Sequence, residues 1–225
     1  STFKLASMMV LMEDNKIRLD EIINIGNGQM NYYNRTMKDV YPIRDGRITV
    51  REAFEKSSNV AISKMVWNAY KDHPERFIEA LYGMHLDQPL GLDIPGERKP
   101  YIKHPSDKKY WYGTSLPWMS IGYEITITPM QMLTFYNAVA NGGKMVKPQF
   151  IKEIRQGNII IKRFEPIIID ESIASSRTID SAKKLMEGVV EHGTAKALNK
   201  SPFKIAGKTG TAQIASGGKG YNKTN

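Results

Sequence analysis

The sequence has no cysteine, few histidines and no long apolar run, and each absence narrows the possible chemistry. Because none of the 225 residues is cysteine, disulfides and a thiol nucleophile are excluded. The longest uncharged apolar run is about eight residues, whereas a membrane-spanning helix needs about 20. Metal-ligand spacing is absent among the four histidines, which are His73, His85, His104 and His192. We therefore expect neither a metal site nor another cofactor.

Basic residues outnumber acidic ones, 32 to 23, which gives a formal net charge of +9. Such a charge attracts acidic partners without identifying one. No RNP sequence, helix-turn-helix or zinc-finger spacing accompanies it, so we expect no nucleic-acid partner. The milder interpretation is a solvated surface near anionic lipid or cell-wall polymer. The glycine-rich stretch 216–220 lacks the GK[ST] ending of a phosphate loop and is interpreted as a flexible turn.

A serine and a lysine stand three positions apart in the opening run STFKLASMMVLM, where Lys4 is the only charged side chain. On a helix, Ser1 and Lys4 would share a face and place a nucleophile beside a possible base. An ordinary lysine is rarely neutral at pH 7, so the site must favour the neutral amine by roughly 4 to 5 kcal/mol. Burial and a second nearby cation both act in that direction. The alternative is a buried helix whose lysine reaches solvent.

A second candidate motif, Ser57-Ser58-Asn59, lies between the helical pattern ITVREAFEKS and the apolar segment VAISKMVW. An inter-helix turn is expected there, and it could present Ser57 and Asn59 to a cleft. A hydroxyl at Ser57 could relay a proton to a leaving amine. The carboxamide of Asn59 could hydrogen-bond both Lys4 and a substrate amide. Helix capping is the alternative explanation.

A third candidate motif, Lys208-Thr209-Gly210-Thr211, lies in a segment that predicts a strand over residues 203–214. Strand alternation would place Thr209 and Thr211 on one face, where two hydroxyls could hold a carboxylate. Gly210 would let a substrate approach the backbone, and Lys208 would supply the second cation. A surface strand with a glycine bulge is the alternative.

The order SxxK, SxN, KTG is the signature of penicillin-recognising serine acyl-transferases and hydrolases. Over nearly its whole length the chain resembles the transpeptidase domain of class B penicillin-binding proteins, notably in residues 120–150 and 192–213. Within that class, Tyr123 in SIGYE favours the septal, cell-division type over the elongation type. The resemblance implies a peptidoglycan D,D-transpeptidase that also binds β-lactams covalently.

The resemblance also implies a role for each motif residue. Ser1 would be the acylated nucleophile, Lys4 its base and Ser57 the proton shuttle, with Asn59 orienting Lys4 and the substrate. Lys208 would be a further catalytic residue, and the substrate-binding residues would be Thr209, Gly210 and Thr211. Thr211 would help to bind the terminal carboxylate of a D-alanyl-D-alanine stem peptide or of a β-lactam. Backbone N–H groups of Ser1 and Thr211 would form the oxyanion hole.

The fold class expected is α+β, a penicillin-binding/β-lactamase-like transpeptidase fold with a largely helical part and an incomplete antiparallel sheet. Residues 1–143 would be mainly helical and carry SxxK and SxN. Residues 144–225 would hold a hairpin around Gln156-Gly157-Asn158, an amphipathic helical segment over 179–198 and the KTG strand. Residues 86–119 are expected to form a long loop.

A start without methionine favours a piece of a longer protein. The resemblance implies a parent with an N-terminal anchor in the cytoplasmic membrane of a bacterium and a catalytic domain on the extracytoplasmic, periplasmic side. Its partners would be stem peptides, the lipid-linked precursor, β-lactams and other cell-wall synthesis proteins. Family sheet strands before SxxK and after KTG are missing here, so the KTG strand could pair with another copy through its exposed edge.

Three other functions are consistent with these motifs. One is a serine β-lactamase, although no deacylating carboxylate motif comparable to that of class A enzymes is evident. Another is a noncatalytic β-lactam sensor or interaction domain. The last is an N-terminal-serine hydrolase, in which the α-amine of Ser1 would be the base in place of Lys4.

Overall fold

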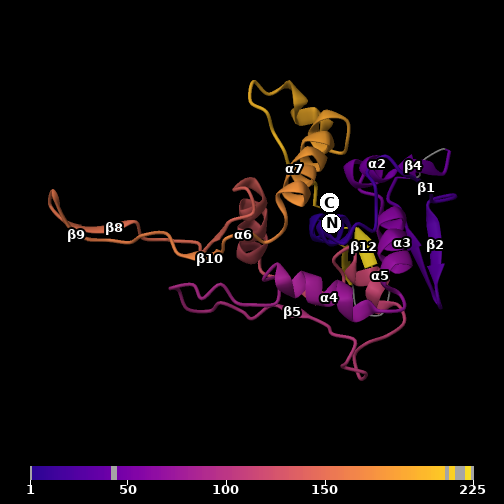
Figure 1. The fold of residues 1–225 in the computed structure, drawn as a ribbon, viewed down its shortest axis with the longest axis horizontal. Helices are drawn as coiled ribbons and strands as arrows, with labels where there is room; N and C mark the ends of the chain where they lie inside the picture. Colours follow the sequence, from indigo (N-terminus) through magenta and orange to yellow (C-terminus); the bar gives the residue numbers. More distant parts are fainter. Residues whose placement is uncertain (1, 42–44, 211–212, 216–220, 224–225) are drawn as a thin grey trace.

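The computed structural model describes residues 2–41, 45–210, 213–215 and 221–223, with side chains described up to residue 210. The mixture of helices and short antiparallel strands confirms the expected α+β class. Figure 1 shows the first helix near the middle of the molecule, with the other helices around it. The helices are α1 (Lys4–Glu13), α2 (Val50–Glu55), α3 (Asn59–Tyr70), α4 (Pro74–Gly83), α5 (Ser115–Met119), α6 (Pro129–Ala140), α7 (Ser176–Glu191) and the 3₁₀ helix η1 (Lys196–Lys200).

Within the described residues, the strands form six two-stranded antiparallel pairs. The pairs are β1 (Ile22–Asn24) with β4 (Arg47–Thr49), β2 (Gln29–Tyr32) with β3 (Arg35–Lys38), β5 (Tyr101–Ile102) with β6 (Ile125–Thr126), β7 (Met145–Val146) with β10 (Ile168–Asp170), β8 (Glu153–Gln156) with β9 (Ile159–Arg163), and β11 (Gln213–Ala215) with β12 (Tyr221–Lys223). The β8–β9 pair confirms the predicted hairpin, and it extends away from the helices at the left of Figure 1.

Helix α1 is the centre of the core because it is apolar on all sides. Every residue from Lys4 to Met12 is buried, which matches a helix without a polar face. It packs against α3, α4 and α7, and Ser7 Oγ donates to Ser120 O at 2.7 Å. The position and register of Lys4 are thereby fixed by packing along the whole helix.

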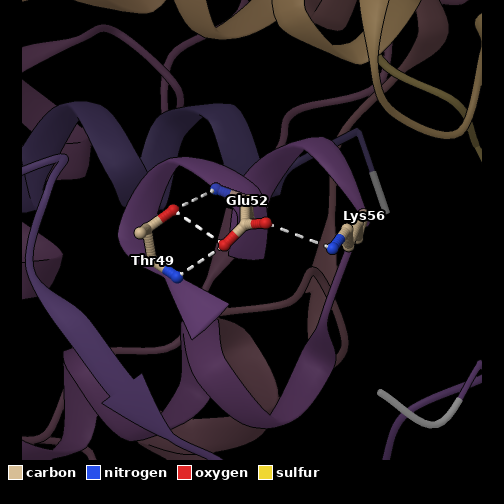
Figure 2. A network of polar contacts seen from close by, with 3 residues as sticks. All are labelled: Thr49, Glu52 and Lys56. Carbon is tan, nitrogen blue, oxygen red and sulfur yellow. Dashed lines mark hydrogen bonds and ion pairs between the residues drawn. The ribbon is translucent and has the colours of Figure 1, made fainter. Parts of the chain in front are cut away.

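Helix α2 is held at its start by a capping box, which Figure 2 shows. The backbone N–H of Glu52 donates to Thr49 Oγ1 at 3.2 Å, and the Glu52 carboxylate accepts from the backbone N–H of Thr49 at 2.9 Å. Lys56 Nζ donates to the other carboxylate oxygen at 3.3 Å. Two N–H groups that the helix start leaves unpaired are satisfied in this way. The turn that follows α2 carries Ser57.

Three sequence-based expectations need correction. The helix predicted from residue 179 begins at Ser176, because the Ser175 side chain accepts from the Thr178 N–H and caps it. The expected loop 86–119 contains β5 and α5. Of the described residues in the strand predicted over 203–214, only those from Gln213 on are in a strand; residues 204–210 are not, and Gly207 N donates instead to Met186 O on α7 at 3.1 Å.

Candidate active site

Lys4 is a buried lysine at the first position of α1, and its side chain is only 1% exposed. Its Nζ donates to Ser57 O at 2.6 Å and to Ser57 Oγ at 3.1 Å. A neutral amine has two N–H donors and one lone pair, so these two bonds use both donors and leave the lone pair to accept a proton. The amine is thus arranged as a base.

The pKa of Lys4 is lowered from 10.5 to about 7. Burial is the largest cause because it disfavours the charged form, and the positive charge of Lys208 adds to it. Asp39 has the opposite, smaller effect. The requirement that the sequence sets for a catalytic lysine, a substantially neutral amine at physiological pH, is met by this environment.

Ser57 lies in the turn between α2 and α3, where the sequence predicts it. Its φ of +58° is in the left-handed region, which a residue other than glycine seldom adopts. Asp39 holds the following residues, since its carboxylate accepts from Ser58 Oγ at 2.8 Å and from Val60 N at 2.9 Å. Ser58 in turn caps α3 by accepting from Ala61 N at 3.0 Å. These contacts support the strained turn that directs Ser57 toward Lys4.

The predicted contact between Asn59 and Lys4 is not formed in the described structure. Asn59 opens α3, and its Nδ2 donates to Lys38 O at 2.9 Å, so the amide nitrogen is bound to β3. The contact to Lys4 comes from Ser57 instead. A role for Asn59 toward a substrate stays a prediction.

Lys208 supplies the second cation near Lys4. Its Nζ is buried, and no other described residue offers it a hydrogen-bond partner. It lies 5.6 Å from the centre of the buried Phe54 ring, within the range of a cation–π contact. Burial lowers its pKa to about 8. An unpartnered buried ammonium is unfavourable, so this group is suited to binding an anion.

The other described KTG residues contact two different parts of the structure, the loop after α7 and the start of α1. Thr209 Oγ1 is 2.7 Å from Thr194 Oγ1, in the loop after α7. A Cβ built at Gly210 would be 3.7 Å from Thr2 Cγ2, so the glycine passes beside the residue that follows Ser1. Ser1 and Thr211 lie outside the described residues, and their predicted roles stay predictions.

Sequence reasoning did not single out three residues that shape this site. Asp39 gave no motif-level signal. Thr194 stands in the family-like segment 192–213 but was assigned no role. Tyr136, on α6, donates from its hydroxyl to Thr2 O at 2.9 Å and so ties α6 to the start of α1. Each is distant in sequence from the segment that it contacts, and spacing along the sequence does not reveal such contacts.

Two kinds of feature are absent from the described residues. They contain no group of three or more His, Cys, Asp or Glu side chains that could hold a metal ion. In the same part of the chain, no helix has the length and apolar character needed to cross a membrane.

Comparison with known proteins gives matches over the full length of the chain. The family described as the penicillin binding protein transpeptidase domain matches residues 1–225. The chain is 29% identical over 221 residues to the penicillin-binding protein PbpB of Mycolicibacterium smegmatis, covering 95% of this chain and 33% of that protein. It is also 29% identical over 182 residues to the peptidoglycan D,D-transpeptidase FtsI of Buchnera aphidicola, covering 78% of this chain and 29% of the relative.

A solved structure agrees with these sequence matches. Penicillin binding protein 3 of Mycobacterium tuberculosis superposes with a TM-score of 0.82 at 26% identity, covering 99% of this chain and 50% of the other. That protein has also been solved in complex with aztreonam. The expected transpeptidase fold is confirmed by this similarity. The chain spans about a third of the length of the curated relatives it matches.

Proposed function

Since the chain belongs to the family of penicillin-binding protein transpeptidase domains, we propose that it catalyses peptidoglycan D,D-transpeptidation through a serine acyl-enzyme. The observation that supports the proposal most strongly is that Lys4, Ser57 and Lys208 lie close together, although they come from three distant segments of the sequence. A lysine of lowered pKa beside a hydroxyl, with a second buried cation to which no described residue is hydrogen-bonded, suits this chemistry.

The reaction would proceed in two steps, acylation of Ser1 and transfer of the acyl group to an acceptor amine. Lys4 Nζ accepts the proton of Ser1 as Ser1 Oγ bonds to the carbonyl carbon between the two D-alanines. The C–N bond then breaks, and the terminal D-alanine leaves with a proton delivered from Lys4 through Ser57 Oγ. An acceptor amine next attacks the ester carbonyl, forms the cross-link and returns a proton to Ser1 Oγ. With a β-lactam, the amide bond of the ring opens in the first step and the ester persists.

Substrate recognition would use the charge of Lys208. No described residue forms a hydrogen bond with the buried Lys208 ammonium. A terminal carboxylate placed between Lys208 and the hydroxyls of Thr209 and Thr211 would give it both a hydrogen-bond acceptor and a negative charge. The backbone N–H groups of Ser1 and Thr211 would hold the developing oxyanion, as the family resemblance implies. Asn59 would bind the substrate amide.

Labelling with a fluorescent penicillin tests the chemistry. We expect the full-length protein to retain a covalent label, and Lys4→Met to lose it while Lys16→Met, which alters an exposed lysine beyond the end of α1, labels like the wild type. Loss of label by turnover would instead support a β-lactamase. Retained labelling in Lys4→Met would show that another group activates Ser1 and would contradict the assignment of Lys4 as the base.

Labelling alone does not separate an enzyme from a noncatalytic β-lactam sensor. A stem-peptide substrate ending in D-alanyl-D-alanine does, because only a transpeptidase releases D-alanine and joins the acyl group to an acceptor amine. Absence of both products from a protein that labels with penicillin would contradict the proposed function.

The location and cellular role belong to the same proposal. Peptidoglycan precursors are cross-linked outside the cytoplasmic membrane, so we place the active site on the extracytoplasmic side, with cell-wall synthesis proteins as partners. A septal role is supported by the resemblance around Tyr123. Protease accessibility in spheroplasts tests the location, and a division defect on depletion tests the role.

A further inference from the structure

The loop after α7 connects the two segments that form the site. Thr194 N donates to Glu55 O at 3.1 Å, and Thr194 Oγ1 lies 2.7 Å from Thr209 Oγ1. Glu55 ends α2, two positions before Ser57, and Thr209 directly follows Lys208. One residue therefore contacts both the segment that carries Ser57 and the segment that carries Lys208.

Close backbone packing holds this loop against α2. A Cβ built at Gly193 would overlap the backbone oxygen of Glu55, so only glycine allows the loop to approach this closely. Gly193 N also donates to Gly188 O at 3.0 Å, and Ala195 N donates to Val189 O at 3.0 Å. Both bonds fasten the loop to the end of α7, which is itself packed on α1 and α2. Thr194 is thus presented from a rigid support.

The segment that carries Lys208 depends on such support. Residues 204–210 are not part of a described strand, and Lys208 Nζ has no hydrogen-bond partner in the described part of the chain. Gly207 N bonds to Met186 O on α7 at 3.1 Å, and Thr209 bonds to Thr194. The distance of Lys208 from Lys4 is therefore set by where its backbone is held.

We propose that Thr194 is a positioning residue that fixes the KTG segment relative to the Ser57 turn, and so places Lys208 beside Lys4. This inference rests on the proposed acyl transfer for its functional consequence. Its structural part, the restraint of residues 204–210 by the Thr194 hydroxyl, is independent of any reaction.

The test compares Thr194→Val, Thr194→Ser and Thr36→Val in the full-length protein. Valine keeps the shape of threonine and removes the hydroxyl, whereas serine keeps the hydroxyl. Thr36→Val is the matched control, because Thr36 is an exposed threonine whose hydroxyl also makes a 2.7 Å hydrogen bond, to Asn31 in the β2–β3 hairpin. The first readout is hydrogen exchange of residues 204–210 without ligand, and the second is the pH dependence of acylation by fluorescent penicillin.

We expect faster exchange of residues 204–210 in Thr194→Val than in the other two variants. Acylation by Thr194→Val should be slower by about three- to tenfold, the loss expected for one neutral hydrogen bond. The midpoint of its acid limb should also move to higher pH, because a displaced Lys208 repels the charged form of Lys4 less. Gly193→Ala should increase the exchange of residues 204–210, slow acylation and raise the midpoint of the acid limb by more than Thr194→Val does.

Unchanged exchange in Thr194→Val would overturn the inference, whether or not the protein acylates. An equal defect in Thr194→Ser would overturn it too, because the hydroxyl would not be the cause. Faster exchange in a protein that never labels would instead support the restraint and contradict the proposed function.

Discussion

The acid limb of the acylation reaction should have its midpoint near pH 7. The pKa of Lys4 falls from 10.5 to about 7, a difference that corresponds to roughly 5 kcal/mol in favour of the neutral amine. At pH 7 the neutral fraction rises from about one molecule in three thousand to about half. Because the neutral form of Lys4 is the base, the rate should increase as the pH rises through 7. It should fall again above about pH 8, because Lys208, whose pKa is lowered to about 8, then loses the charge that would bind the substrate carboxylate.

The assay is the second-order rate constant of acylation by a fluorescent penicillin, measured from pH 5 to pH 10 at constant ionic strength. Two substitutions test the causes. Lys208→Gln removes a repelling cation and should move the midpoint upward, although not to 10.5, because burial is the larger cause. Asp39→Asn removes an attracting anion and should move the midpoint downward. The midpoint is read separately from the maximum rate, which Lys208→Gln also lowers if Lys208 binds the substrate carboxylate.

An acid limb centred above about pH 9 in the wild type would refute the reasoning, since Lys4 would then be an ordinary lysine. Midpoint shifts of the wrong sign in the two variants would refute the electrostatic explanation, even if the wild-type midpoint were correct.

Three further predictions concern stability and positioning. Lys4→Met should raise the free energy of unfolding by about 1 to 4 kcal/mol below pH 7. Between pH 7 and 10.5 the Lys4 amine of the wild type holds its proton only in the unfolded state, so wild-type stability rises with pH and the difference in stability between the two proteins narrows. Urea titrations at several pH values will check this. Tyr136→Phe removes the hydrogen bond to Thr2 O and should slow acylation about fivefold with a melting temperature near that of the wild type; an unchanged rate would exclude a positioning role. Thr49→Val breaks the capping box with Glu52 and should cost about 1 kcal/mol by denaturant unfolding, and a loss below about 0.3 kcal/mol would contradict the importance of this cap.

The parts of the fold that follow local rules were predictable from the sequence. An apolar run without a polar face predicts the central position of α1, and Gln156-Gly157-Asn158 between the segments KPQFIKEIR and NIIIKRFEP predicts the β8–β9 hairpin. Helix α6 also follows a local rule, because proline occupies its first turn and Thr128 caps it. In each case the residues that determine the local structure lie within one short stretch of the sequence.

The sequence identified the residues of the candidate site, but it predicted only some of the contacts between them. The motifs place Ser57 and Lys208 near Lys4, and the structure brings these three together. The predicted Asn59–Lys4 bond is not formed in the described structure: Asn59 Nδ2 donates to Lys38 O, on a strand with no motif of its own, and Lys4 Nζ donates to Ser57. A hydrogen bond between two exposed or half-exposed groups depends on which backbone passes within about 3 Å, and sequence spacing does not determine that distance.

The strand expected at KTG shows a second limit. Alternation within residues 203–214 favours a strand, yet a strand needs a neighbour for its backbone groups. In the described structure, Gly207 N bonds to α7 and regular pairing begins at Gln213. Local pattern gives the preference of a segment, while the available partner decides its conformation.

Peptide mapping by mass spectrometry after benzylpenicillin treatment tests the central claim most directly. The account predicts a penicilloyl adduct on Ser1 in the full-length wild-type protein, an adduct that accumulates in Lys16→Met and is lost or strongly slowed in Lys4→Met. An adduct on another residue, or one that forms equally fast without the Lys4 amine, would contradict the claim that Lys4 activates Ser1.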